Sequence, residues 1–251
     1  MLRPYTSQAQ AATWLRDLGP QVYWDAGNAQ LKEYRQWFAD LIAWWPEMVV
    51  FESTTPVMKF YWRTVNEVKA HLPDCVVVMT GYHSMRKPEE TLELSRTDIV
   101  LRSNHVDFAL KRIVPEIEGH PDWRRQCEVE GLAIRLEDGT FRSTGNFRQV
   151  EPLERVPDVD RDLVAWKNYA YENGNFLQTP GTYATSVIRD CTFGKCTFCR
   201  YNGPELTFSM RPVEQSLDEY ERLITKHGVR EIFDASGVWY RGKEARAFAA
   251  G

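Results

Sequence analysis

Short apolar runs alternate with amphipathic stretches over roughly the first 120 residues of this chain. The runs predict four strands, at residues 21–24, 48–52, 75–79 and 98–101. The amphipathic stretches predict helices at residues 31–43, 61–70, 88–94 and 107–117. The third run is apolar throughout and rich in valine, which is typical of a strand covered on both faces. Strands alternating with helices predict a parallel sheet with right-handed crossovers.

This plan is Rossmann-like, and in such sheets ligands bind beyond the carboxyl ends of the strands. Ser53 and Thr54 follow the second predicted strand, and Thr80 and Gly81 follow the third. No G-x-G-x-x-G follows any of these strands and the chain has no phosphate-loop motif, which argues against a nicotinamide or flavin dinucleotide. The hydroxyls are candidate contacts to some other ligand, although each taken singly is better explained as a loop hydroxyl bonded within the protein.

The pattern changes after residue 130. Residues 132–136 and 140–142 flank Asp138-Gly139, a strong hairpin signal. A stretch rich in charge, proline and aromatics follows up to residue 180, and we interpret it as an ordered linker. Residues 182–188 then predict a strand, residues 213–224 a helix and residues 229–233 a second strand. We therefore expect three parts: a Rossmann-like domain at 1–130, a hairpin and linker at 131–180, and a new βαβ unit at 181–251.

The composition is that of an ordinary globular protein. Of its 251 residues 43% are hydrophobic, and the formal net charge of −4 gives no electrostatic footprint for nucleic acid. No apolar run is long enough to span a bilayer and Met1 does not begin a signal peptide. The five cysteines are an odd number, with three of them clustered. They favour a reducing compartment over a disulfide framework, so we expect a cytoplasmic protein.

The cluster Cys191-Thr-Phe-Gly-Lys-Cys196-Thr-Phe-Cys199 is the most informative motif. Three incidental thiols are one explanation, but three within nine residues make it a weak one. Structural zinc needs four ligands, and the next histidine downstream is His227. The C-x4-C-x2-C spacing also occurs in plant-type two-iron ferredoxins, which need a further cysteine that this chain lacks after Cys199. The remaining alternative is a [4Fe-4S] cluster on three thiolates, whose fourth iron binds a small molecule.

Here the sequence resembles the radical S-adenosylmethionine (SAM) superfamily, in particular members with an N-terminal cobalamin-binding domain. The usual spacing of that superfamily is C-x3-C-x2-C, and the loop resembles a variant found in the cobalamin-associated branch. Phe198 matches the aromatic position that packs near the adenine. The run from Arg211 through Asp234 resembles the first helix and second strand of the radical SAM barrel, and residues 73–83 resemble a strand and glycine-histidine loop of the cobalamin domain.

The resemblance implies the roles of individual residues. It makes Cys191, Cys196 and Cys199 the cluster ligands, and Asp234 and Ser236, with Phe198, candidate contacts to SAM. It assigns Ser53, Thr54, Thr80 and Gly81 to the cobalamin-binding edge. The D-x-H-x-x-G motif is absent, so cobalamin would bind without a protein histidine on cobalt.

The function implied is that of a radical SAM enzyme that cleaves SAM reductively to a 5′-deoxyadenosyl radical. The outcome would be methyl transfer or a rearrangement at an unactivated carbon of a small-molecule substrate, with an external electron donor of the flavodoxin or ferredoxin type. The expected fold is a Rossmann-like domain followed by the start of a radical SAM (β/α) partial barrel. The chain is short for that architecture, and we expect a truncated form. The alternative is a non-catalytic cobalamin-binding module with a structural zinc site.

Overall fold

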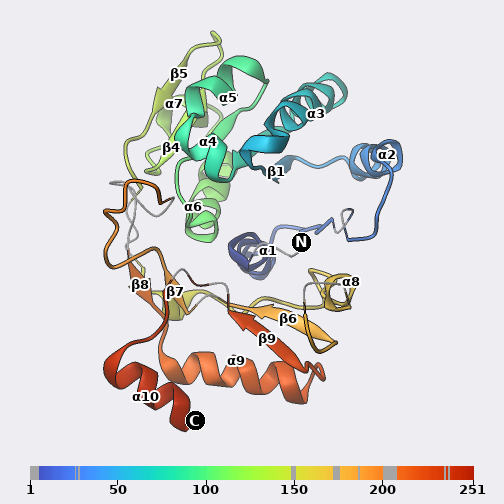
Figure 1. The fold of residues 1–251 in the computed structure, drawn as a ribbon. Helices are drawn as coiled ribbons and strands as arrows, with labels where there is room; N and C mark the ends of the chain where they lie inside the picture. Colours follow the sequence, from blue (N-terminus) through green and yellow to red (C-terminus); the bar gives the residue numbers. More distant parts are fainter. Residues whose placement is uncertain are drawn as a thin grey trace. The chain divides into compact units, whose positions relative to one another are not determined.

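The computed structural model describes residues 6–25, 27, 29–147, 151–171, 176–185, 187–199, 208–234, 236 and 238–251. The chain forms two compact units. The first contains Met1–Lys32 and Gln149–Gly251, and the second contains Glu33–Arg148. Each unit is described by itself, on the ribbon of Figure 1.

The second unit is built on a five-stranded sheet in the order β1-β2-β3-β4-β5. Its strands are β1 (Met48–Glu52), β2 (Val76–Thr80), β3 (Ile99–Leu101), β4 (Leu132–Arg135) and β5 (Phe141–Ser143). The first three pair in parallel, and β4 and β5 add antiparallel to the edge at β3. All five residues of β2 are buried, as expected for a central strand covered on both faces.

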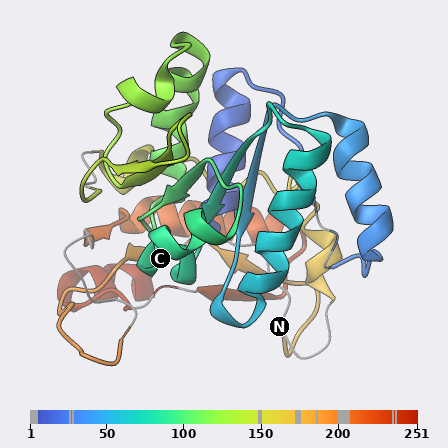
Figure 2. The same ribbon diagram turned by 90° about the horizontal axis from the view of Figure 1, so that it is seen from above.

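Helices connect the parallel strands of this unit, as Figures 1 and 2 show. The connecting helices are α3 (Met58–His71), with a 3-10 turn η1 (Thr55–Val57) before it, and α4 (Tyr82–Arg86) with α5 (Pro88–Leu94). Helix α2 (Tyr34–Trp44) precedes β1, and α6 (Val106–Gly119) and α7 (Trp123–Gln126) lie between β3 and the antiparallel β4. The core packs Val65 and Val68 of α3 against Val77 and Met79 of β2. This packing fixes the strand ends at which the candidate loops begin.

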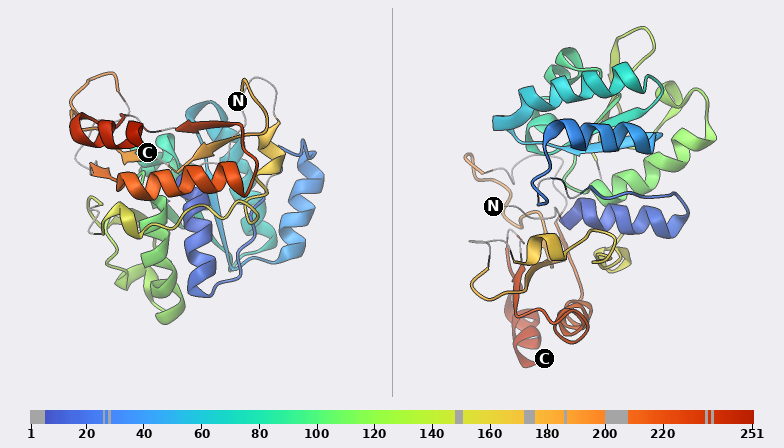
Figure 3. Two further views of the ribbon diagram at one scale, coloured as in Figure 1. Left: turned by 90° about the horizontal axis from the view of Figure 1, so that it is seen from below. Right: turned by 90° about the vertical axis from the view of Figure 1, so that its right-hand side faces the viewer.

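The first unit holds a parallel pair of strands, β6 (Gly181–Ala184) and β9 (Glu231–Asp234), joined through α9 (Val213–Thr225). Helix α9 runs alongside both strands in Figures 1 and 3, and its Leu223 shares a core with Ala184 and Ile232. A short antiparallel pair, β7 (Ile188–Arg189) and β8 (Ser209–Met210), flanks the cysteine loop. The other elements are α1 (Thr6–Leu18), η2 (Leu153–Arg155), α8 (Lys167–Ala170) and α10 (Gly242–Ala250).

Two predicted elements need correction. Residues 21–24 form no strand: they lie in irregular structure with Tyr23 half exposed and, within the described residues, pair with no sheet. The strand predicted at residues 182–188 is divided into β6 and β7, because Ala184 ends the pairing with β9 and Ile188 pairs with β8 instead. Ser186, between the two, lies outside the described residues.

The hairpin also has a role that the sequence pattern did not show. Ile134 of β4 pairs with Ile99 of β3, so the hairpin extends the sheet of the second unit rather than standing beside a linker. The compact units therefore divide the chain at residues 32 and 148, whereas we expected boundaries near residues 130 and 180.

Candidate functional site

The three clustered cysteines lie on a single loop that begins directly after β7. Cys191, Cys196 and Cys199 are each half-buried, and none forms a disulfide. The amide of Cys199 donates to the carbonyl of Cys196 at 3.1 Å, which forms a tight turn between these two. Among the residues that the structure describes, no three histidine, cysteine or acidic side chains are gathered closely enough to hold a metal ion. The loop thus presents its thiols together along the chain without enclosing a formed metal site.

The first of these thiols has an environment that favours a metal ligand. Backbone N–H groups of Gly194 and Phe193 point at the sulfur of Cys191 and lower its thiol pKa. The left-handed backbone of Gly194, at a φ of 56°, forms part of this turn. The thiolate is the form of cysteine that binds metals. A donor set of three accessible thiols, one of them stabilised as thiolate, fits the three protein ligands of the expected cluster.

Two predicted SAM contacts, Asp234 and Ser236, lie at the carboxyl end of β9. The Asp234 carboxylate accepts from the amides of Val187, at 3.4 Å, and Ser236, at 2.7 Å. The Ser236 hydroxyl accepts from the amide of Ile188 at 3.2 Å. Burial raises the pKa of Asp234, with the hydrogen bonds acting against it. These residues therefore hold the segment that leads into the cysteine loop, whatever else they contact.

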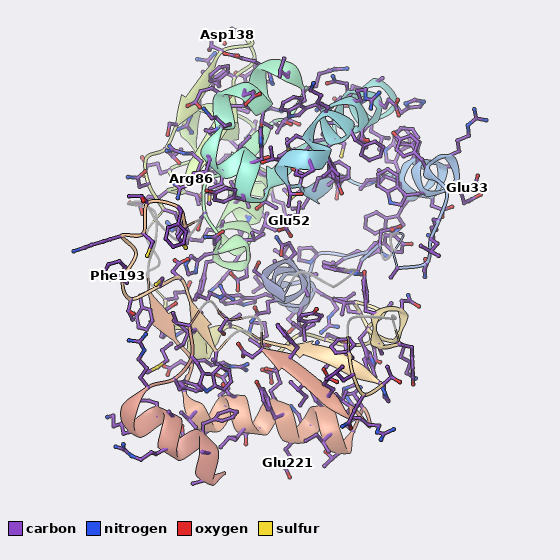
Figure 4. All side chains as sticks on the ribbon, in the orientation of Figure 1. Glu33, Glu52, Arg86, Asp138, Phe193 and Glu221 are labelled. Atoms are coloured by element: carbon purple, nitrogen blue, oxygen red, sulfur yellow. The ribbon has the colours of Figure 1, made fainter. Side chains whose placement is uncertain are left out.

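The aromatic side chains of the loop are exposed. Phe198 is 90% exposed and Phe193 is 62% exposed. Figure 4 shows Phe193 on the outside of the loop. An apolar ring held in solvent has surface available for a flat partner such as an adenine ring. The structure thus leaves Phe198 available for the predicted contact, with little of its ring covered by the residues that the structure describes.

A buried ion network supports the carboxyl end of β6, the strand before β7, and the sequence analysis missed it. Glu219 of α9 accepts from Arg161 at 2.8 Å and from Arg211 at 2.7 Å. The same carboxylate accepts from the amide and hydroxyl of Thr185, at 3.1 and 2.9 Å, directly after β6. Asp158 also pairs with Arg211. The position of Glu219 among the buried positions of α9 was the available signal, because a buried carboxylate requires partners.

The second unit brings the four predicted polar residues together at the carboxyl ends of β1 and β2. The amide of Ser53 donates to the carbonyl of Thr80 at 3.1 Å. Gly81 has a φ of 101°, and a Cβ there would lie 2.2 Å from the carbonyl oxygen of Ser53. The two loops therefore touch through backbone at Gly81.

The hydroxyls at this edge differ in how far they are available to a ligand. Ser53 is buried, and its hydroxyl lies 2.6 Å from the sulfur of Met58. Thr80 is buried as well. Thr54 is exposed and Gly81 is half-buried. Of the four predicted contacts, Thr54 alone presents an exposed hydroxyl to a ligand at this edge.

Comparison with known proteins places this arrangement in context. No family model matches the chain. Over 187 residues, or 73% of the chain, it is 26% identical to the anaerobic magnesium-protoporphyrin IX monomethyl ester cyclase of Cereibacter sphaeroides. The same type of cyclase from Rubrivivax gelatinosus is 26% identical over 185 residues. These matches cover 29% and 32% of the two cyclases, so the chain spans about a third of the length of its curated relatives.

Solved structures match nearly the whole chain. The cobalamin-dependent SAM radical enzyme OxsB, with aqua-cobalamin and SAM bound, superposes with a TM-score of 0.77 over 98% of this chain and 34% of its own, at 16% identity. The chain has the fold of the part of OxsB that it matches. The radical SAM methyltransferase TsrM from Kitasatospora setae matches with a TM-score of 0.65 over 94% of the chain and 45% of its own, at 16% identity. The predicted fold class is thereby confirmed.

Of the helices in the described ranges, none is both long and apolar enough to cross a bilayer.

Proposed function

We propose that this chain is the cobalamin-domain and early-barrel portion of a radical SAM enzyme. The observation that carries the proposal is the three-cysteine loop, which follows β7. The strand before it, β6, is held by its parallel pairing with β9 and, at its carboxyl end, by Glu219. The match to OxsB over nearly all of the chain supports it, as does the sequence relation to the cyclases. The substrate would be a small molecule, and the reducing electron would come from a flavodoxin or ferredoxin type of donor.

In this proposal Cys191, Cys196 and Cys199 hold a [4Fe-4S] cluster. With SAM bound, such a cluster supplies an electron that cleaves the sulfonium and starts radical chemistry at an unactivated carbon. The contribution of the chain is to supply three thiolates, of which Cys191 is favoured by the two amides at its sulfur. Asp234 and Ser236 fix the entry of the loop, and Phe198 offers an apolar face for the adenine.

We assign the second unit to the cobalamin-binding type of domain. Its polar loops lie at the carboxyl ends of parallel strands, where ligands of such sheets bind, and Thr54 is exposed there. OxsB and TsrM are described with cobalamin bound, which supports this assignment. Its test is retention of hydroxocobalamin by the full chain through gel filtration. A chain that stays colourless at saturating hydroxocobalamin would remove cobalamin from the proposal and leave the cluster untouched.

Anaerobic reconstitution with iron and sulfide tests the cluster. We expect about four iron and four sulfide per chain, as for a [4Fe-4S] centre. Cys196→Ala should lose most of this iron. Cys127→Ala is the matched control, because Cys127 is a buried thiol of the second unit and should leave the iron content unchanged. One bound zinc without iron would instead favour a non-catalytic cobalamin-binding module with a structural metal.

A further inference from the structure

A cavity of about 310 Å³ lies at the end of the second unit's sheet where β2 and β3 begin. Four basic and two acidic side chains line it: Lys69, Arg96, Arg124, Arg135, Asp98 and Glu137. The formal charge of this lining is 4 − 2 = +2, whereas the whole chain carries −4. The loops that carry Ser53 and Thr80 follow the opposite ends of these strands, so the cavity is separate from the edge assigned to cobalamin.

One pair of charges in the lining is structural. Asp98 accepts from the amide of Val77 at 2.8 Å, from Lys69 at 3.1 Å and from Arg124 at 2.5 Å. Lys69 is buried as well and donates to the carbonyl of Cys75 at 2.9 Å. Lys69 and Asp98 therefore neutralise each other inside the unit, and Asp98 has little capacity left for further cations.

Arg96 and Arg135 are the surplus cations. Arg135 donates through Nε to the carbonyl of Thr97 at 2.9 Å, and through Nη2 to the carbonyl of Ser95 at 2.8 Å and to that of Leu92, which leaves the Nη1 group for a ligand. Arg96 donates through Nη1 to the carbonyl of Lys69 at 3.1 Å. Within the described part of the chain neither guanidinium forms an ion pair. Burial lowers the pKa of Arg135, and the nearby charges of Arg124 and Arg96 lower it further, against the opposing effect of Asp98.

The remaining carboxylate does not offset this surplus. Glu137 pairs with Arg125, outside the lining, at 3.4 Å, and both of these side chains are more than half exposed. Exposed pairs of this kind contribute little and are screened by salt. Arg96 and Arg135 line the cavity without a carboxylate partner among the described residues. Such guanidinium groups are suited to tetrahedral oxyanions, which accept several N–H bonds at once.

We propose that this cavity binds a phosphate-type dianion, held by Arg96 and Arg135 beside Arg124, which also pairs with Asp98. Its volume lies at the lower end of the range for small-molecule pockets, enough for a phosphate group with part of the molecule that carries it. The proposal does not depend on the radical SAM assignment, because none of these residues belongs to the cysteine loop or to the carboxyl ends of β1 and β2.

Isothermal titration of the full chain with inorganic phosphate and with adenosine monophosphate, at low ionic strength, tests the proposal. We expect saturable binding of both, at one site per chain. Equal affinities would mean that the phosphate group alone is recognised, and tighter binding of the nucleotide would mean that the cavity also contacts the carrier. Absence of saturable binding for both probes would overturn the proposal.

Variants locate the site. Arg96→Gln removes an exposed guanidinium with a single backbone bond and should weaken phosphate binding at least tenfold. Arg35→Gln is the matched control, since Arg35 is exposed on α2 and does not line the cavity. The affinity of this variant for phosphate should stay within twofold of that of the unchanged chain. Equal affinities of these two variants would overturn the assignment. If circular dichroism shows that Arg96→Gln is unfolded, Arg124→Lys decides: weaker binding supports the site, and unchanged binding overturns it.

Discussion

Replacing Glu219 by glutamine should destabilise the first unit more than any exposed charge change on the same helix. The carboxylate is buried and accepts four hydrogen bonds, from Arg161, from Arg211 and twice from Thr185. Glutamine keeps one acceptor oxygen but turns an NH₂ group toward guanidinium donors. Arg211 retains its ion pair with Asp158. Among the described residues, Arg161 is left with neutral hydrogen-bond partners, the hydroxyl of Thr182 and the carbonyl of Tyr183.

The expected cost follows from the buried cation that remains. Burial lowers the pKa of Arg161 and Glu219 opposes that effect, so removing the carboxylate leaves the desolvation of the guanidinium uncompensated. Removing one partner of a buried ion pair lowers the unfolding free energy by about 3–5 kcal/mol. With a urea dependence of about 2 kcal/mol per molar, the midpoint of unfolding should fall by about 2 M.

Urea unfolding of Glu219→Gln and of Glu221→Gln measures this difference. Glu221 is two residues along α9 and exposed, and Figure 4 shows its side chain on the outer side of the helix. Hydrogen exchange of residues 213–225 reports on the first unit alone. The Glu221 variant should stay within about 0.5 kcal/mol of the parent, as exposed substitutions usually do. A Glu219 variant equally close to the parent would refute the supporting role of the network.

Two further predictions concern the second unit. Burial raises the pKa of Cys75 to about 11. At pH 8, iodoacetamide should therefore label the loop thiols of the folded chain and leave Cys75 unlabelled. Equal labelling rates for these cysteines, measured by mass spectrometry, would contradict the burial of Cys75. Gly81→Ala should lower the unfolding free energy by more than about 2 kcal/mol. The added Cβ would clash with the carbonyl oxygen of Ser53, and alanine is also strained at the positive φ of this position. Gly139 also has a positive φ but has open space around it, so Gly139→Ala should cost about 1 kcal/mol of unfolding free energy. Equal losses of stability for the two variants in thermal unfolding would argue against a close approach of Gly81 to Ser53.

The sequence predicted the second unit well because its strands are apolar and its helices amphipathic. Residues 48–52 and 88–94 form the predicted strand and helix with the same bounds. The strand predicted at residues 21–24 was wrong, because a short apolar run forms a strand only if a partner strand is present. Sheet membership of β4 depends on pairing with a strand about 35 residues earlier, which local patterns do not encode.

The candidate site was predictable only where chemistry is concentrated in one motif. The three cysteines stand within nine residues and form a recognisable motif, so they were found directly. Arg211 and Glu219 are as close in the sequence but form no known motif, and their partner Arg161 lies 58 residues before Glu219 and meets them only in the fold. Asp234 and Ser236 were predicted from resemblance, and the structure adds that they bond to the segment before the loop. Their contact with SAM stays a prediction.

The most direct test of the proposed function is electron paramagnetic resonance of the reconstituted, dithionite-reduced chain with and without SAM. A cluster held by three thiolates has one iron open to an outside ligand, so we predict a reduced [4Fe-4S] signal whose g values shift when SAM is added. Cys127→Ala should give the same signal and Cys196→Ala none. A cluster signal that SAM leaves unchanged, or a chain that binds zinc and gives no signal, would contradict the account.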